Sequence, residues 1–178
     1  KAITLRNLAT HTSGLPTGER SDQYRTKAEK MGWSFALKQL SKLKLESVPG
    51  EKFNYSNIGM ALLGHVIEIR GGKTYEKAVA ERVLRPLGMD NTWVSRPAGA
   101  DKSVHDFTYG IFAPAGGFHS NAVDLAKFAA GAVGAAPAPL MESLALTFSP
   151  QGSDSGGRPL HLGWHEEGSP SRLSHTGL

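Results

Sequence analysis

The sequence predicts an α+β fold in which helices make up most of the chain and two antiparallel strands follow them. Hydrophobic residues recur at helical spacing in several stretches between positions 33 and 148, whereas strand-like patterns are confined to positions 160–177. The chain has 178 residues, of which 39% are hydrophobic and 20% charged. This balance suits a globular domain and excludes collagen-like, coiled-coil and fully disordered chains.

Two helices separated by polar chain are predicted for the first fifty residues. Residues 5–9 form a short helix, which ends in the polar segment 10–16, where Gly and Pro break it. The hydrophobic residues of 33–43 follow the spacing of an amphipathic helix. A Pro-Gly pair at 49–50 then turns the chain.

The middle of the chain is predicted to contain a buried helix and a second helix after it. Residues 58–69 are hydrophobic around almost the whole circumference, which is typical of a buried helix, and a glycine pair at 71–72 ends it. Thr74 suits the N-cap of the next helix, over 75–83. Irregular chain is expected over 95–117.

Two further helices are expected before the strands. Asn121 and Asp124 form a capping pair ahead of a helix over 125–132, and a short helix over 140–148 follows a Pro-Ala-Pro segment.

The strands are predicted over 160–166 and 173–177, joined by a polar turn. A two-stranded hairpin alone is marginal in water and needs neighbouring strands that this chain does not supply. We therefore expect residues 1–178 to form a single incomplete domain from a longer protein. Hydrophobic surface left by the missing sheet favours self-association of the isolated fragment.

The composition excludes several classes of site. The formal net charge is +4, and the densest basic group, Lys38, Lys42 and Lys44, is interpreted as the solvated face of a helix, so no nucleic-acid partner is predicted. No stretch approaches the ~18 consecutive hydrophobic residues of a membrane-spanning helix. Cysteine is absent, which excludes disulfides, thiolate metal sites and cysteine nucleophiles.

A Tyr-x-Asn segment, Tyr55-Ser56-Asn57, directly precedes the predicted buried helix. A phenol at a helix entry can act as a general base if nearby cations lower its pKa from about 10, and an asparagine amide offers a donor and an acceptor to a substrate amide. The structural alternative is that Tyr55 packs and Asn57 caps the helix.

Two other segments offer further candidates. In His175-Thr176-Gly177, strand alternation places His175 and Gly177 on one face, and the glycine allows a ligand to approach the backbone; the alternative is an edge strand with a surface histidine. The glycines of residues 114–120 permit a tight loop ahead of a helix, where either an anion or a simple turn fits.

His161 and His165 share one face if their segment is a strand, and Glu167 is near. Two histidines at a hairpin are more often surface residues than ligands. We predict no metal and no other cofactor.

Taken together, these segments resemble the penicillin-recognising serine hydrolases, in particular the class C β-lactamase-like group, which includes D-alanyl-D-alanine carboxypeptidases and esterases. The resemblance runs over nearly the whole chain. It is carried by five segments in the family's order: residues 3–16, the Pro-Gly lead and Tyr-x-Asn motif at 49–57, Pro86-Leu87-Gly88-Met89 within 84–92, the glycines and helix entry at 115–126, and the His-x-Gly motif at 175–177. It implies the helix-rich part of a serine β-lactamase-like fold whose sheet is incomplete.

The family's nucleophile stands in a Ser-x-x-Lys motif that precedes the segment matched at residues 3–16. The only literal match in this chain is Ser41-Lys42-Leu43-Lys44, inside a predicted helix and after that segment, and we interpret it as a coincidence. We therefore expect this chain alone to be inactive and the longer protein to be a hydrolase. The alternative is a non-catalytic binding module that has lost the nucleophile.

The resemblance implies that a serine attacks a β-lactam, a D-alanyl amide or an ester and forms an acyl-enzyme. Tyr55 would be the base or proton shuttle, and His175 would stand where a lysine often stands, near the substrate carboxylate. A free histidine is mostly neutral at pH 7, which favours a peptidase or esterase over an efficient β-lactamase.

The remaining implied contacts are to substrate. Asn57 would hold the acylamide side chain, Thr176 and Gly177 belong to the motif strand, and the backbone N–H of Leu178 would be an oxyanion donor. The expected partner is a small-molecule or peptide substrate. Periplasmic or secreted localisation follows if the resemblance holds.

Overall fold

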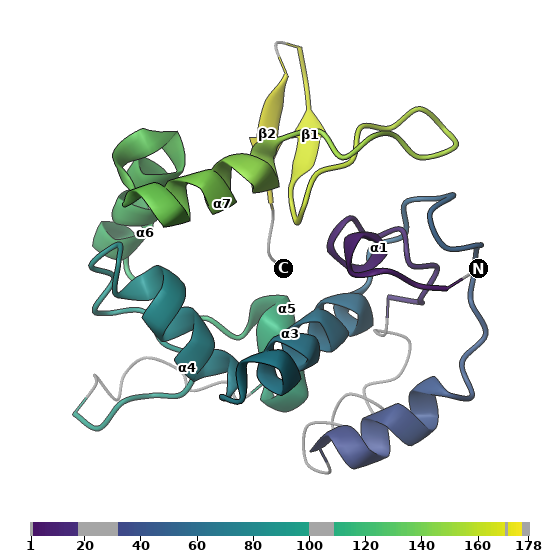
Figure 1. The fold of residues 1–178 in the computed structure, drawn as a ribbon, viewed down its shortest axis with the longest axis horizontal. Coiled ribbons are helices and arrows are strands. Elements are labelled where there is room, and N and C mark those ends of the chain that lie inside the picture. The colour runs from purple at the N-terminus through teal and green to yellow at the C-terminus, as the bar shows by residue number, and fades with distance from the viewer. Residues whose placement is uncertain (1, 18–31, 100–108, 170, 176–178) are drawn as a thin grey trace.

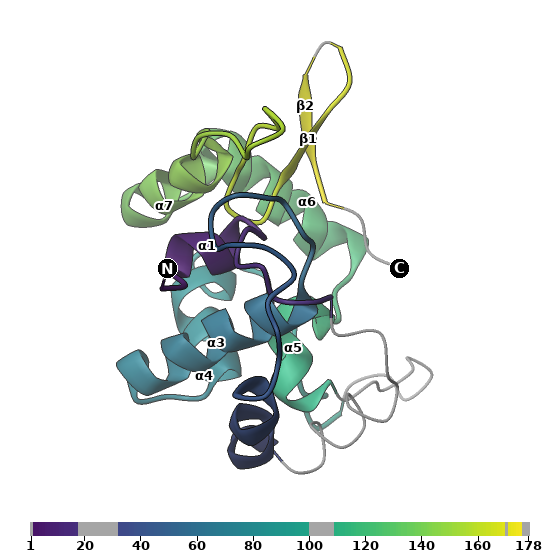
Figure 2. The ribbon, with the colours of Figure 1, turned by 90° about the vertical axis from the view of Figure 1, so that its right-hand side faces the viewer.

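The computed structural model describes residues 2–17, 32–99, 109–169 and 171–175. The elements in chain order are α1 (Leu5–Ala9), the helical residues 32–40, α3 (Asn57–Gly71), α4 (Tyr75–Val79), the π-helical turn η1 (Ala80–Leu84), the 3-10 turn η2 (Gly110–Phe112), α5 (Ala113–Gly116), α6 (Ala122–Ala130), the π-helical turn η3 (Gly131–Ala135), α7 (Ala138–Phe148), β1 (His165–Glu167) and β2 (Arg172–Ser174). In two perpendicular views, the β1–β2 hairpin and α7 lie at the top, α1 in the middle, and α3, α4 and residues 32–40 below (Figures 1 and 2).

Side-chain caps fix where the helices begin. The Thr4 hydroxyl accepts the N–H of Asn7 at α1, and the Ser56 hydroxyl accepts the N–H of Gly59 at α3. Thr74 caps α4 as predicted, by accepting the N–H of Lys77. The predicted glycine stop is also confirmed, since Gly72 ends α3 in the left-handed conformation with a φ of 62°.

The hydrophobic core lies between α1, α3 and η2. Its buried residues are Leu8, Leu15, Ile58, Ala61 and Phe112. The helical residues 32–40 pack against it through Trp33, Phe35 and Leu40. The core therefore anchors the loop that enters α3, which carries Tyr55.

The prediction that α3 is buried on all sides is wrong. Ile58, Gly59, Ala61 and Gly64 are buried, but Ile67, on the opposite face, is 38% exposed, and Ile69, in the last turn, is 66% exposed. The buried face packs on α1 and α5, and the small residues on it allow close approach: a Cβ at Gly64 would overlap the Pro114 ring. The hydrophobic character of the other face is thus not explained by contacts within this chain.

Two other boundaries differ from the predictions. The helix predicted over 33–43 ends at residue 40, so Leu43 lies in the following exposed turn. Residues 113–116, expected to be a loop, form the short helix α5, which Pro114 suits because proline is tolerated in a first helical turn. The loop at 114–120 leads into α6, whose N-terminus is capped within the chain: the Asn121 side chain accepts the N–H of Asp124.

The strands are shorter than predicted, three residues each, with His165 opposite Ser174 and Glu167 opposite Arg172. Residues 160–164 form no strand, because their backbone groups bond elsewhere. Leu160 donates to the Gly152 carbonyl at 3.0 Å, and Gly163 donates to the Ala9 carbonyl at 2.8 Å. These bonds tie the base of the hairpin to the end of α1 and thereby place β1 beside residues 10–16.

Asp124 fixes α6 to the chain that follows η1. Its fully buried carboxylate accepts the N–H of Asn91 at 2.7 Å and the hydroxyl of Thr92 at 2.9 Å, and it pairs with Lys127 at 3.1 Å. Burial raises the pKa of this carboxyl. The hydrogen bonds from Lys127, Asn91 and Thr92 together lower it by more than burial raises it, so the net pKa is below its ordinary value. The carboxylate is therefore the ionised centre of this junction.

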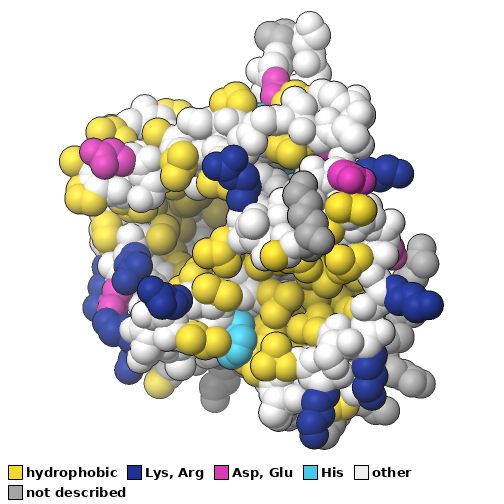
Figure 3. Space-filling model, turned by 45° about the vertical axis from the view of Figure 1, so that its right-hand side comes forward, with side chains coloured by type: hydrophobic (Ala, Val, Ile, Leu, Met, Phe, Trp, Pro, Cys, Tyr) yellow, Lys and Arg dark blue, Asp and Glu magenta, His cyan; other side chains and the backbone are white. Residues whose placement is uncertain are grey.

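Large hydrophobic side chains are exposed on several helices, among them Ile69 on α3, Leu125 on α6 and Leu146 on α7. Figure 3 shows a broad hydrophobic area on one face of the molecule. In the described parts of the chain, no single helix could span a bilayer; only Ala122–Ala135 together with Ala138–Phe148 meet the length and composition criteria, and they are bent by 90°.

Candidate functional site

Tyr55 lies in the loop that enters α3, and ring side chains from three distant parts of the chain lie around it. Its ring stacks on the imidazole of His11, with 4.5 Å between the ring centroids and 28° between the planes. The Tyr55 side chain is half-buried, whereas His11 is only 2% exposed. The phenol thus has a buried histidine on one side and an accessible edge.

His175 comes immediately after β2, and the hairpin brings it to Tyr55. The two ring centroids are 6.3 Å apart, although the residues are 120 positions apart in the sequence. The structure therefore brings together the two residues for which we predicted catalytic roles, while the roles themselves stay predictions.

Of the other predicted site residues, the structure describes only Asn57. Asn57 is the first residue of α3, half-buried, and its N–H donates to the Thr17 carbonyl at 3.2 Å. The alternative in which Asn57 caps α3 is wrong, because Ser56 is the N-cap. Thr176, Gly177 and Leu178 lie outside the described residues.

Histidine and arginine side chains that the sequence reasoning did not assign complete the surroundings of Tyr55. The ring of His165, on β1, lies 5.3 Å from that of His175 and 6.2 Å from that of Tyr55. The Arg158 guanidinium stacks over the Phe53 ring at 3.8 Å. We call His11, His165 and His175, which surround Tyr55, the histidine cluster.

The charges in this cluster favour neutral imidazoles at its centre. Burial, which is the largest cause, and the positive charges of His165, His175 and Arg158 together lower the pKa of His11 from 6.5 to about 4. Burial likewise lowers the pKa of His165, with His175 and Arg158 contributing. At pH 7, His11 is therefore a neutral ring that can accept a hydrogen bond.

His11 makes the stability of the fold depend on pH. Above pH 6.5 its ring is neutral in the folded and the unfolded chain, but between pH 6.5 and about 4 only the unfolded chain binds the proton. Lowering the pH from 7 to 5 is therefore expected to reduce the free energy of unfolding by about 2 kcal/mol through this residue. Carboxylates with lowered pKa values, such as Asp154, act only below this window.

Urea unfolding at pH 7 and pH 5 measures this effect, with His11→Asn as the comparison because asparagine does not titrate. The loss of stability between the two pH values should be smaller in the variant by about 2 kcal/mol. An equal loss in both proteins would show that His11 does not stay neutral in the fold.

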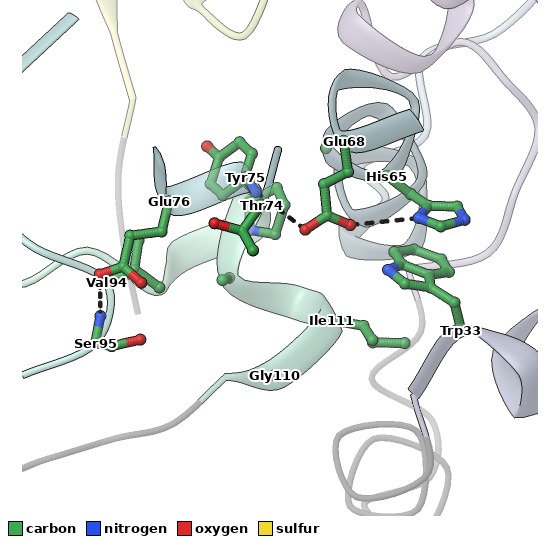
Figure 4. A pocket seen from close by; sticks show the side chains of 13 residues that line it. Trp33, His65, Glu68, Thr74, Tyr75, Glu76, Val94, Ser95, Gly110 and Ile111 are labelled. Carbon is green, nitrogen blue, oxygen red and sulfur yellow. Dashed lines mark hydrogen bonds and ion pairs between the residues drawn. The ribbon is translucent and has the colours of Figure 1, made fainter. Parts of the chain in front are cut away.

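A cavity of about 180 Å³ lies elsewhere, between α3, α4 and η2 (Figure 4). Its carboxylates already serve the fold: Glu68 accepts the N–H of Tyr75 at 3.0 Å, and Glu76 accepts the N–H of Ser95 at 2.9 Å. Burial raises the pKa of Tyr75 to about 12, which makes it a poor base. Tyr55, Asn57 and His175, the predicted site residues that the structure describes, do not line this cavity.

His161 and His165 do not share a strand face, because β1 begins only at His165. His161 is buried, and its two ring nitrogens contact the Phe148 carbonyl at 2.9 Å and the Glu166 carboxylate at 3.1 Å. Among the residues that the structure describes, no group of three histidine or acidic side chains is arranged to hold a metal ion.

Ser41, in the coincidental Ser-x-x-Lys match, lies in the exposed turn after residues 32–40. Its hydroxyl donates to the Lys38 carbonyl at 2.9 Å. The hydroxyl of this serine is thus hydrogen-bonded to the last turn of its own helix. Among the described residues, no contact joins it to Tyr55.

His11 is the member of the histidine cluster that was not considered as a candidate from the sequence. It stands in a run of polar residues, from Thr10 to Ser13, that is entirely buried. Buried polar side chains need partners, but a sequence alone does not reveal that this run is buried, because its polarity is typical of a surface loop. The only available signal was its position within the matched segment at residues 3–16.

Comparison with known proteins identifies relatives of this chain. The family model described as "Beta-lactamase" matches residues 1–178. The human protein "Putative beta-lactamase-like 1" is 31% identical over 153 residues, which cover 79% of this chain and 30% of that protein. The Escherichia coli K12 protein "D-alanyl-D-alanine-carboxypeptidase/endopeptidase AmpH" is 37% identical over 101 residues, which cover 53% of this chain and 25% of that one.

Solved structures share the fold. A structure described as a class C beta lactamase is 25% identical, with a TM-score of 0.74 over 94% of this chain and 48% of that one. A beta-lactamase/D-alanine carboxypeptidase from Pseudomonas syringae is 23% identical, with a TM-score of 0.73 over 94% and 49%. The chain thus spans about half the length of these structures and a quarter to a third of the two curated relatives. The observed fold is the helix-rich part of a serine β-lactamase-like fold, as predicted.

Proposed function

Since this chain belongs to the beta-lactamase family, whose model matches it from residue 1 to residue 178, we propose that it forms part of the active site of a serine acyl-transfer hydrolase. The complete protein would act on β-lactams, D-alanyl peptides or esters through an acyl-enzyme. The observation that carries the proposal is the approach of Tyr55 to His175, whose ring centroids lie 6.3 Å apart.

In this proposal Tyr55 moves the proton. It takes the proton of the attacking serine, gives it to the leaving group and then helps to activate water for deacylation. Positive charge near a phenol favours its phenolate form, and the Arg158 guanidinium stacks over the ring of Phe53, two residues before Tyr55, at 3.8 Å. The His11 ring covers one side of the phenol, and Phe53 and His165 pack on His11 with 5.7 and 6.2 Å between ring centroids.

The substrate contacts are proposed from the motif positions. Asn57 would hold the acylamide side chain, Thr176 and Gly177 would line the motif strand, and the N–H of Leu178 would be an oxyanion donor. The nucleophile would come from a Ser-x-x-Lys segment other than Ser41–Lys44 in the complete protein. Residues 1–178 would then be one incomplete domain.

Peptides and esters are favoured over β-lactams as physiological substrates. Histidine stands at position 175, where the family often has a lysine, and an imidazole holds a substrate carboxylate less firmly than a permanently charged ammonium does. The Escherichia coli relative is named as a carboxypeptidase and endopeptidase, which supports a peptide substrate.

Labelling of the complete gene product with a fluorescent penicillin tests the proposal. We expect covalent labelling of the protein, loss of label when an excess of a D-alanyl-D-alanine peptide competes, and hydrolysis of p-nitrophenyl esters. Ser41→Ala is the matched control and should label normally, because the Ser41 hydroxyl is engaged by Lys38. Absence of both labelling and ester hydrolysis, or loss of labelling in Ser41→Ala, would contradict the proposed function.

A further inference from the structure

His11 holds the backbone on both sides of Tyr55. The N–H of Asn54, the residue before Tyr55, donates to the His11 carbonyl at 2.7 Å. The N–H of Ser56, the residue after it, donates to Nδ1 of the His11 ring at 3.1 Å. One residue therefore satisfies the two amide groups that bracket the phenol.

The His11 ring also contacts the phenol itself. It stacks on Tyr55 at 4.5 Å between centroids, and Phe53 packs edge-on against the other part of the ring at 5.7 Å. Offset stacking of this kind restricts the tilt of an aromatic side chain. The two backbone hydrogen bonds fix the position of the Tyr55 main chain, and the ring stacking fixes the direction of its side chain and thereby the position of its hydroxyl.

This arrangement is energetically costly at His11. Within the described residues, His11 is the only non-glycine residue with a positive φ, 54°. Because Nδ1 accepts the Ser56 N–H, the proton of the neutral ring is on Nε2, which is buried and has no hydrogen-bond partner among the described residues. Strained backbone and unpaired buried donors are typical of sites where the geometry serves function.

We propose that His11 is a positioning residue, which fixes the phenol of Tyr55 for proton transfer by holding Asn54 and Ser56 and by stacking on the ring. This inference rests on the proposed function for its kinetic consequence. The placement of Tyr55 by His11 is measurable without any substrate.

Two substitutions separate the bonds from the stack. His11→Asn keeps an acceptor near the place of Nδ1 and tolerates a positive φ, but it removes the ring. His11→Phe keeps the ring and removes the acceptor. His65→Asn is the matched control, because His65 stacks on Trp33 at 4.0 Å, outside the histidine cluster.

The first measurement is hydrogen exchange at the Ser56 amide in the complete protein. We expect exchange about tenfold faster in His11→Phe and near the wild-type rate in His11→Asn and His65→Asn. In the wild type, protection at Ser56 should decline as the pH falls toward 4, since protonated Nδ1 cannot accept, whereas protection in His11→Asn should not change after correction for intrinsic exchange. The charged groups that affect the ring in this range are His165, His175 and Arg158.

The second measurement is the split between kcat and KM for ester hydrolysis. Misplacement of the phenol should lower kcat by about ten- to a hundredfold in both His11 variants with little change in KM, and His65→Asn should leave both constants unchanged. The Tyr55 ring resonances should shift in His11→Asn, because the stacked ring is gone.

Unchanged Ser56 exchange in His11→Phe, together with unchanged Tyr55 resonances in His11→Asn, would overturn the inference. If His11→Phe does not fold, the pH dependence of Ser56 protection in the wild type decides the matter, and protection that persists at pH 4 contradicts the role of Nδ1. A wild-type protein that is neither labelled nor hydrolytic would refute the proposed function, while the exchange and resonance data still decide whether His11 places Tyr55.

Discussion

Tyr55→Phe is expected to lower the rate of acylation of the complete protein by about 10²–10⁴-fold, the range that a general acid–base group contributes. The substitution removes only the hydroxyl. The ring that stacks on His11 at 4.5 Å remains, so the loop into α3 keeps its conformation. The loss should therefore appear in the chemical step and not in folding.

Tyr75→Phe is the matched control for this prediction. Tyr75 is also a tyrosine next to a helix entry, but burial raises its pKa to about 12, and it lines the separate cavity between α3, α4 and η2. Acylation by this variant should proceed at the wild-type rate.

Single-turnover acylation with a fluorescent penicillin, combined with urea unfolding, makes the comparison. Tyr55→Phe should unfold with nearly the wild-type midpoint while acylating at least a hundredfold more slowly. Equal acylation rates in Tyr55→Phe and wild type would remove Tyr55 from the mechanism. A large fall in stability would instead identify the hydroxyl as structural.

Local signals made the helices of this chain predictable. The caps at Thr74 and Asn121 and the glycine stop at 72 depend on hydrogen bonds within one turn, and the structure confirms each of them. The Tyr-x-Asn and His-x-Gly motifs were similarly visible, because a motif is a local pattern. Their proximity follows from the family's fold, which the resemblance supplied.

Long-range contacts made the remainder unpredictable. The strand pattern at 160–164 is overridden by a bond to Gly152, eight residues before Leu160, and by a bond to Ala9, which is distant in the sequence. The exposed face of α3 is hydrophobic, so composition could not show that Ile67 lies at the surface. His11 was missed for the same reason, since its importance lies in bonds to residues 54 and 56 and not in its neighbours.

Gly14→Ala is expected to reduce the free energy of unfolding by about 2–5 kcal/mol. Gly14 has a φ of 77°, and a Cβ there would overlap the carbonyl oxygen of Ser47 and lie 3.1 Å from its carbonyl carbon. The left-handed conformation costs about 1–2 kcal/mol for an alanine, and overpacking against a rigid group adds about 1–3 kcal/mol.

The loss of stability is large because the atom that the new Cβ would overlap, the Ser47 carbonyl oxygen, belongs to the backbone. The two chain segments that meet there are also hydrogen-bonded to each other: Glu46 donates to the Gly14 carbonyl at 2.8 Å, and Gly50 donates to the Thr12 carbonyl at 2.7 Å. A methyl group must separate these segments, and the separation breaks the bonds beside it. No side-chain rotation relieves the overlap.

Gly72→Ala isolates the conformational part of this cost. Gly72 also has a positive φ, 62°, but a Cβ there would meet nothing within 4 Å. Urea unfolding should therefore show a loss of about 1 kcal/mol for Gly72→Ala and several times more for Gly14→Ala. Similar losses in the two variants would mean that residues 12–14 and 46–50 are not packed as tightly as the structure shows. The loop that carries Tyr55 would then lack the rigid support on which its placement beside His175 depends.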